Sequence, residues 1–539
     1  MITFFKRWMT QQTDGLTAAA FIVGSSSLAS RILGIFRDRV LAGTFGAGMQ
    51  LDAYYAAFRL PDTAYNLVIL GAVSAGFIPV FTAWMEKEGK ESAMRLAARV
   101  LSAVGLVLIA ASLFIIVFAP VLIPWLAPGF TAEGNKLAVD LTRVMALSPI
   151  FLGLSAVVGG VMQSMRRFIG FALAPVFYNL GIIAGTMFFG PEIGVMGAAV
   201  GVVLGALMHL IVQSVAATGV GFWPPAAPNF KDPGVRKILT LMGPRMAALG
   251  VSQISLTVLF AVATLTETGA VAVFNLSNNI QSFPLGLFGI SFAIAAFPAL
   301  SRAAGASDDE GYRQTLSSAG RKICFFVIPA TAVFFLLRAQ IVRLVLGQGV
   351  FGWEDTIRTA DMLGIMALSL VAQSLSPLLI RALYARQDTW TPFLISVFAE
   401  ATTIISALVL HGPFGLRGIG IAFSVGATVQ AIILLIVLRK RFGRLGQGET
   451  LYSVYRTVIA TVALCVVGFP IREWLGTIYP LETVWQVALQ AGGTMLFGGL
   501  AFLVAAWIMK SSELEELAHG IKSKFMRKTR LVEGAEQAR

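Results

Sequence analysis

Apolar stretches of about 20 residues follow one another from Leu16 almost to Lys510, and each can cross a hydrocarbon core of about 30 Å as a helix. The runs are continuous, which favours helices over the alternating strands of a membrane barrel. Because 57% of the residues are hydrophobic and only 13% are charged, a soluble protein of this length would lack polar surface. The pattern predicts an all-α membrane protein with about fourteen transmembrane helices.

Basic residues gather in alternate loops, for example at Lys87 and Lys90 and again at Arg166 and Arg167. This positive-inside pattern predicts an even number of spans with both termini in the cytoplasm. The net charge of +13 also includes a basic tail after Lys510, for which we expect contact with anionic membrane lipids. Nucleic acid is not an expected partner.

The residues give no sign of an enzyme or of a metal site. Cys324 and Cys465 lie in separate apolar spans, and the three histidines are scattered without ligand spacing. A nucleophile elbow and a phosphate-cradling loop are also missing. We therefore expect a transporter that needs no cofactor.

An internal repeat divides the chain. A span that opens at Pro175 and ends at Gly190-Pro191 is echoed about 220 residues later by one that opens at Pro392 and ends at Gly412-Pro413. Small residues recur every four positions after each hairpin, which is typical of close helix packing in lipid. These are Gly197, Gly201 and Gly205 in the first copy, and Gly418, Ala422 and Gly426 in the second.

Six helices per copy return the chain to its starting side, so the repeat predicts two like-oriented lobes related by an axis along the membrane normal. The expected parts are an N-lobe of helices 1–6 (residues 1–230), a C-lobe of helices 7–12 (231–445), helices 13–14 (446–510) and a cytoplasmic basic tail (511–539).

Charged residues concentrate in the first two helices, where burial in a membrane makes each of them a functional candidate. They are Arg31, Arg37, Asp38, Asp52 and Arg59. Arginine binds phosphate through two parallel hydrogen bonds, so these side chains suit an anionic headgroup such as a pyrophosphate. The alternative is structural: a charge cluster at a helix end, internal ion pairs, and an Arg59 side chain that extends to the interface.

One carboxylate, Glu400, lies in the middle of a later span, four residues after Ser396 and therefore on the same helix face. These oxygens suit Na⁺, or Glu400 can carry a proton, and either would couple transport to an ion gradient. A polar contact between helices is the alternative.

Several of these segments resemble one family. Ser30-Arg31-Ile32-Leu33-Gly34 with Arg37-Asp38, followed by Asp52-Ala53 and by Phe58-Arg59-Leu60-Pro61, is similar to the opening signature of the MurJ (MviN) lipid II flippases. Phe283-Pro284-Leu285-Gly286 and Thr391-Pro392 are similar to later segments of that family. The resemblance extends over essentially the whole chain.

The resemblance implies a member of the multidrug/oligosaccharidyl-lipid/polysaccharide exporter superfamily, located in the bacterial cytoplasmic membrane. Such a protein moves lipid II, an undecaprenyl-pyrophosphate-linked peptidoglycan precursor, to the periplasmic leaflet by alternating access. It also implies a substrate site at Arg31, Arg37, Asp38, Asp52 and Arg59, and a lipid-tail groove at helices 13 and 14. We expect the protein to be a monomer.

The chain departs from the family pattern at three places. Tyr65-Asn66 replaces a double arginine, Leu70 replaces a glutamate, and Asn279 stands where the eighth helix usually supplies an arginine. Asn279 can still donate a hydrogen bond to a phosphate or sugar, with less help from charge. The alternatives are export of another oligosaccharide-lipid, an ion-coupled drug antiporter of the same superfamily, and a membrane scaffold without transport.

Overall fold

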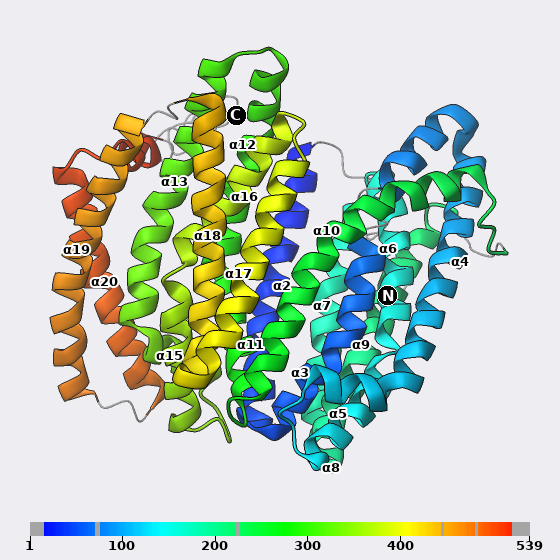
Figure 1. Ribbon diagram of the computed structural model, residues 1–539, viewed down its shortest axis with the longest axis horizontal. Helices are drawn as coiled ribbons and strands as arrows, with labels where there is room; N and C mark the ends of the chain where they lie inside the picture. The colour runs from blue at the N-terminus through cyan, green and yellow to red at the C-terminus, as the bar shows by residue number, and fades with distance from the viewer. Residues whose placement is uncertain (1–15, 71–75, 223–226, 444–446, 480–482, 520–539) are drawn as a thin grey trace, which may run out of the picture. The chain divides into compact units, whose positions relative to one another are not determined.

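The computed structural model of the protein describes residues 16–70, 76–222, 227–443, 447–479 and 483–519. Within these ranges every regular element is a helix (Figure 1). An apolar segment in lipid has no hydrogen-bond partner for its backbone except itself, so the helix is its stable form. The protein is an all-α membrane protein, and this part of the prediction is confirmed.

The chain begins with α2 (Leu16–Phe45), α3 (Met49–Tyr65), α4 (Ile78–Leu126), α5 (Ala132–Met145), α6 (Ser148–Ser164), α7 (Phe168–Ala184), α8 (Gly190–Ile193), α9 (Val195–Thr218) and α10 (Pro233–Thr264). It continues with α11 (Ala270–Pro284), α12 (Ser291–Gly305), α13 (Asp309–Leu336), α14 (Arg338–Leu346), α15 (Trp353–Ala367), α16 (Leu370–Ala385), α17 (Trp390–Phe414), α18 (Leu416–Phe442), α19 (Gln447–Ile478) and α20 (Val484–Ile508). Short π-helical segments interrupt three of the apolar stretches: η1 (Asn66–Leu70), η3 (Gly185–Phe189) and η4 (Leu285–Ile290).

Ten helical stretches in the described ranges are long and apolar enough to cross a membrane. The pair α15 and α16, bent by 45°, would make an eleventh. The count of fourteen stays a prediction.

By its internal contacts the chain forms two compact units. The first unit comprises Met1–Leu276, Val345–Arg358 and Ile404–Ile419, and the second unit comprises Ser277–Leu344, Thr359–Thr403 and Gly420–Arg539. The lobe boundaries expected at residues 230 and 445 stay a prediction.

In the first unit, α7 packs against α9 along a stripe of glycines. A Cβ atom on Gly201 would lie 3.0 Å from the Cα of Gly185, which leaves no room for a side chain there. Two such backbones meet this closely only where both residues are small. The predicted packing role of the first glycine stripe is therefore confirmed.

The internal repeat reappears in the local backbone. Gly194 and Gly415 both take a left-handed conformation, with φ of 60° and 55°, and the N–H of each donates to the carbonyl four residues earlier at 2.9 Å. Arg166 and Gln387 likewise share positive φ values of 56° and 61°. These pairs lie about 220 residues apart, as the sequence repeat predicts.

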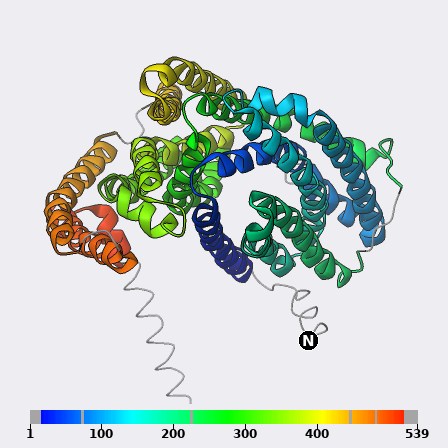
Figure 2. The same ribbon diagram turned by 90° about the horizontal axis from the view of Figure 1, so that it is seen from below.

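In the second unit, α19 and α20 pair with one another, and α19 packs against α13 (Figure 2). Polar contacts fasten this pair near both ends. Arg321 of α13 forms ion pairs with Glu449 at 3.0 Å and with Glu513 at 3.4 Å, while Gln340 donates to Gln490 of α20 at 2.8 Å. These contacts hold the two helices against α13 and α14.

Candidate functional site

Arg37 and Asp38 form a buried ion pair about two turns before the end of α2. The exposed fractions of their side chains are 23% and 6%, and the shortest nitrogen–oxygen distance is 2.8 Å. Arg37 also donates from Nη1 to Oδ1 of Asn179 on α7 at 3.2 Å, and the Asn179 amide donates to the carbonyl of Ser30 at 3.3 Å. Asn179 therefore ties the ion pair to both α2 and α7, and it was not found by the sequence analysis.

Three phenol side chains lie near this ion pair. Tyr54 and Tyr55 of α3 and Tyr178 of α7 lie within electrostatic range of Arg37. The rings of Tyr54 and Tyr55 meet edge to face, with centroids 5.5 Å apart. A guanidinium among hydroxyl groups is a suitable binding site for an anion.

Arg31 follows Ser30, whose hydroxyl accepts a hydrogen bond from Asn179. The side chain of Arg31 is exposed. The structure thus brings Arg37 and Asp38 together and leaves Arg31 accessible on α2. An exposed guanidinium keeps its full hydrogen-bonding capacity for a ligand.

Asp52 has a different environment from Arg37. It lies in the first turn of α3, is only 3% exposed, and accepts hydrogen bonds from the backbone N–H groups of Gly269 at 2.5 Å and Ala272 at 2.8 Å. These groups begin α11, where a carboxylate satisfies free N–H groups and the positive end of the helix dipole. Asp52 is thus a helix cap in this structure.

Further contacts join three segments of the chain, which are residues 43–52, 264–272 and 348–358. We call these three segments the clasp. Each contact links the end of α2, the α2–α3 turn or the α10–α11 turn to residues 350–358, which lead into α15 and form its first turns. They are Val350 N–H to the Gly43 carbonyl at 2.9 Å, Ala47 N–H to the Asp355 carboxylate at 3.3 Å, and the Arg358–Glu267 ion pair at 2.8 Å. The clasp therefore fixes one end of the first unit through many polar contacts.

Arg59 lies on α3 beside a carboxylate that the sequence analysis missed. Asp62 is within electrostatic range of Arg59, and it accepts a hydrogen bond from Asn66 at 2.8 Å. Arg59 also reaches α10, where Nη2 is 3.5 Å from the carbonyl oxygen of Gln253. An ionisable residue three positions after Arg59 inside an apolar span was a signal of this pair.

The remaining candidates, Asn279, Ser396 and Glu400, belong to the second unit. The Asn279 carbonyl accepts a hydrogen bond from Ser282, while the Ser396 hydroxyl accepts one at 2.9 Å from Gln430 of α18. Glu400 is half-buried one turn after Ser396 on α17. In the described part of the chain, no three His, Cys, Asp or Glu side chains group as metal ligands.

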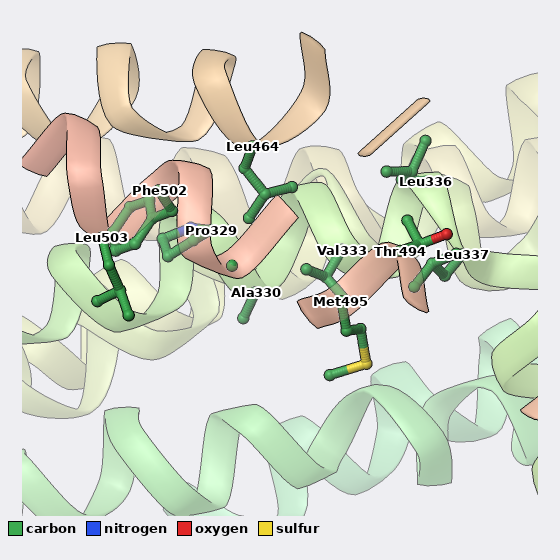
Figure 3. A pocket seen from close by; sticks show the side chains of 11 residues that line it. Pro329, Ala330, Val333, Leu336, Leu337, Leu464, Thr494, Met495, Phe502 and Leu503 are labelled. Atoms are coloured by element: carbon green, nitrogen blue, oxygen red, sulfur yellow. The ribbon is translucent and has the colours of Figure 1, made fainter. Parts of the chain in front are cut away.

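An apolar groove of about 290 Å³ lies between α13, α19 and α20 in the second unit (Figure 3). Its walls are hydrocarbon except for Thr494. Other lining residues include Pro329, Val333, Leu464, Met495, Phe502 and Leu503. With so few hydrogen-bonding groups, the groove suits an apolar segment of a ligand.

Comparison with known proteins places these features in a family. The model of the family described as "Lipid II flippase MurJ" matches residues 41–486. The chain belongs to the MurJ family. Among its relatives, a probable lipid II flippase MurJ of Rhizobium tropici is 29% identical over 500 residues, covering 90% of this chain and 91% of the relative. The lipid II flippase MurJ of Burkholderia cenocepacia is 28% identical, covering 92% and 97%.

Solved structures support the same fold. A MurJ lipid II flippase in an inward closed conformation matches with a TM-score of 0.74 at 22% identity, over 90% of this chain and 98% of that one. An inward-facing multidrug resistance transporter of the MATE family, in the MOP superfamily, matches with a TM-score of 0.67 at 16% identity, covering 79% and 99%. Membership of the MurJ family makes this chain a transporter and a multi-pass inner-membrane protein.

Proposed function

We propose that this protein moves lipid II from the cytoplasmic to the periplasmic leaflet by alternating access. The observation that carries the proposal is the family match over residues 41–486. The Arg37–Asp38 ion pair, which lies just before the matched range, supplies the charged group for an anionic headgroup. A buried ion pair costs desolvation energy, so a membrane protein keeps one where it serves a function or a specific contact.

Arg37 is the proposed contact for the pyrophosphate. Asp38 and Asn179 hold its guanidinium, so the planar donor group is oriented before the substrate arrives. Arg31 supplies a second, accessible guanidinium. In the second unit, Asn279 is proposed to donate a hydrogen bond to the headgroup.

The groove between α13, α19 and α20 is the proposed site for part of the polyprenyl tail. Burial of a hydrocarbon tail against these apolar walls is favourable. The polar contacts at both ends of α19 and α20 keep the groove in place.

The clasp is the proposed gate, with Asp52 as its cap on α11. We propose cytoplasmic termini, which put the end of α2 and therefore the clasp on the periplasmic side. Opening the clasp would require the N–H groups of α11 to lose the Asp52 carboxylate.

Glu400, together with Ser396, is the proposed coupling site for H⁺ or Na⁺. The Ser396 hydroxyl donates to the carbonyl of Pro392 and accepts from Gln430, so its oxygen is held on the helix face that also carries Glu400. The test measures the rate of lipid II flipping as a function of Na⁺ concentration and of pH, for wild type and for Glu400→Gln. A variant with an unchanged ion response would show that Glu400 has a structural role.

The proposed function is tested with the full chain as a monomer in proteoliposomes that carry labelled lipid II in one leaflet. Wild type is expected to move the label to the opposite leaflet, and Arg37→Ala is not. A wild-type protein that leaves the label in place would refute the proposal. Export of another oligosaccharide-lipid predicts movement of that lipid instead.

A further inference from the structure

A second polar cluster lies along one face of α3. The cluster consists of Tyr55, Arg59 and Asp62 of α3 and of Asn66, the first residue of η1. These residues are spaced by four, three and four positions, so their side chains project from the same side of the helical segment. All four are half-buried. Asp62 and Asn66 are joined by a hydrogen bond of 2.8 Å.

Two other helices of the first unit contribute to this cluster. Gln253 comes from α10, where its carbonyl meets Arg59 at 3.5 Å. Tyr178 comes from α7 and lies within electrostatic range of Asp62, Tyr65 and Arg37. The cluster therefore adjoins the Arg37 site through Tyr178.

Four buried polar atoms of this cluster have no hydrogen-bond partner among the residues that the structure describes. They are the hydroxyl oxygens of Tyr55 and Tyr178, Nε of Arg59 and Oε1 of Gln253. A buried polar group without a partner costs about 1–3 kcal/mol, so several of them together need an explanation. One explanation is a polar ligand that supplies the missing hydrogen-bond partners.

The chemistry of the cluster indicates which ligand this is. Asp62 offsets the charge of Arg59, so the cluster has little net attraction for a phosphate. It offers a carboxylate, two amides and phenol groups, which are donors and acceptors that match hydroxyl and acetamido groups. Four of the nine tyrosines of the chain, Tyr54, Tyr55, Tyr65 and Tyr178, gather in this region, and their rings can cover the apolar faces of a sugar.

We propose that Asp62, Asn66, Gln253 and Tyr178 bind the saccharide that is attached to the pyrophosphate at Arg37. The inference rests on the proposed function and adds the residues that recognise the sugar. The connection between the two sites matches the substrate, because in a lipid-linked saccharide the first sugar is bonded directly to the pyrophosphate.

The test measures binding of three lipids to the purified full chain: polyprenyl pyrophosphate, the same lipid with one N-acetylated sugar, and the same lipid with the N-acetylated disaccharide. Wild type is expected to bind the sugar-bearing lipids about tenfold or more tightly than the sugar-free lipid. Asn66→Ala and Gln253→Ala, which leave the charges of Asp62 and Arg59 in place, are expected to lose most of this difference while binding the sugar-free lipid within about twofold of wild type.

Gln213→Ala is the matched control, because Gln213 of α9 is also a buried amide whose Oε1 has no partner among the described residues. It should keep the wild-type preference. Equal wild-type affinity for the three lipids would overturn the inference without any variant, and so would an equal loss for sugar-bearing and sugar-free lipids in the variants. Wild type that binds none of the lipids would overturn the proposed function itself.

Discussion

Asp52 accepts a hydrogen bond of 2.8 Å from the backbone N–H of Ala272, and this contact joins the first turn of α3 to the first turn of α11. Asp52→Asn keeps the shape of the side chain but removes its charge and replaces one acceptor oxygen with a donor. Loss of such a cap costs about 1 kcal/mol or more. We expect the variant to open the clasp more often.

The measurement is the labelling rate of Thr266→Cys by an impermeant thiol reagent, with Cys324 and Cys465 replaced by alanine. Asp52→Asn should raise this rate several-fold, since about 1.4 kcal/mol is a factor of ten in an equilibrium. Glu354→Gln is the control, because it neutralises an exposed acid in the first turn of α15. Equal rates in wild type and Asp52→Asn would show that the cap does not hold the clasp closed.

A second prediction concerns the ion pair of α2. Arg37→Met removes the guanidinium that neutralises the buried Asp38 carboxylate, and loss of one partner of a buried pair costs about 3 kcal/mol or more. Adding Asp38→Asn should restore much of the thermal stability in detergent, while flipping stays absent in both variants. If the single and double variants have the same melting temperature, Arg37 and Asp38 contribute no coupling energy.

Local features of this protein were predictable from its sequence, and long-range ones were not. Apolar run length predicts the helices, and burial of charge points to Arg37 and Asp38, because both depend on nearby residues. Asn179 holds Arg37 across 142 positions of sequence, a contact that follows only from the packing of α2 on α7. The same holds for Asp52. The sequence shows a charged residue within an apolar span, but it does not show that the partners of this carboxylate are the N–H groups of α11.

The glycine stripe gives a third prediction. Gly201→Val would place a branched side chain against the backbone of Gly185, so α7 and α9 would have to separate. We expect a loss of about 2 kcal/mol or more in stability, measured as the melting temperature in detergent. Gly320→Ala is the control, because a Cβ at Gly320 meets nothing within 4 Å. A wild-type melting temperature for Gly201→Val would contradict the close approach.

The turn between α16 and α17 gives a fourth prediction, on pH. Partial burial alone would raise the pKa of Asp388, but hydrogen bonds from Thr391 and Arg441 outweigh it and lower that pKa below its usual value. A lowered pKa stabilises the fold above the unfolded-state value of about 3.9 and loses this effect as pH falls through the folded value. The melting temperature of wild type should therefore exceed that of Asp388→Asn by a constant amount near neutral pH. The difference should shrink below about pH 4, and a difference that is the same at all pH values would refute the assignment.

The apolar groove gives the last prediction. Gly499 lines the groove between α13, α19 and α20, and a Cβ on it would meet nothing within 4 Å. Gly499→Phe can therefore fill part of the 290 Å³ with a ring while α20 keeps its backbone and its contacts with α19. If the groove holds the polyprenyl tail, the ring competes with the tail, and flipping of lipid II should fall about tenfold with little change in melting temperature. Leu496→Phe is the matched control, since Leu496 lies on the same helix, is 59% exposed and is not part of the groove lining. Equal flipping by the two variants would place the tail outside this groove, whereas a loss confined to Gly499→Phe would assign the groove to the tail, because the two substitutions differ mainly in the space that the new ring fills.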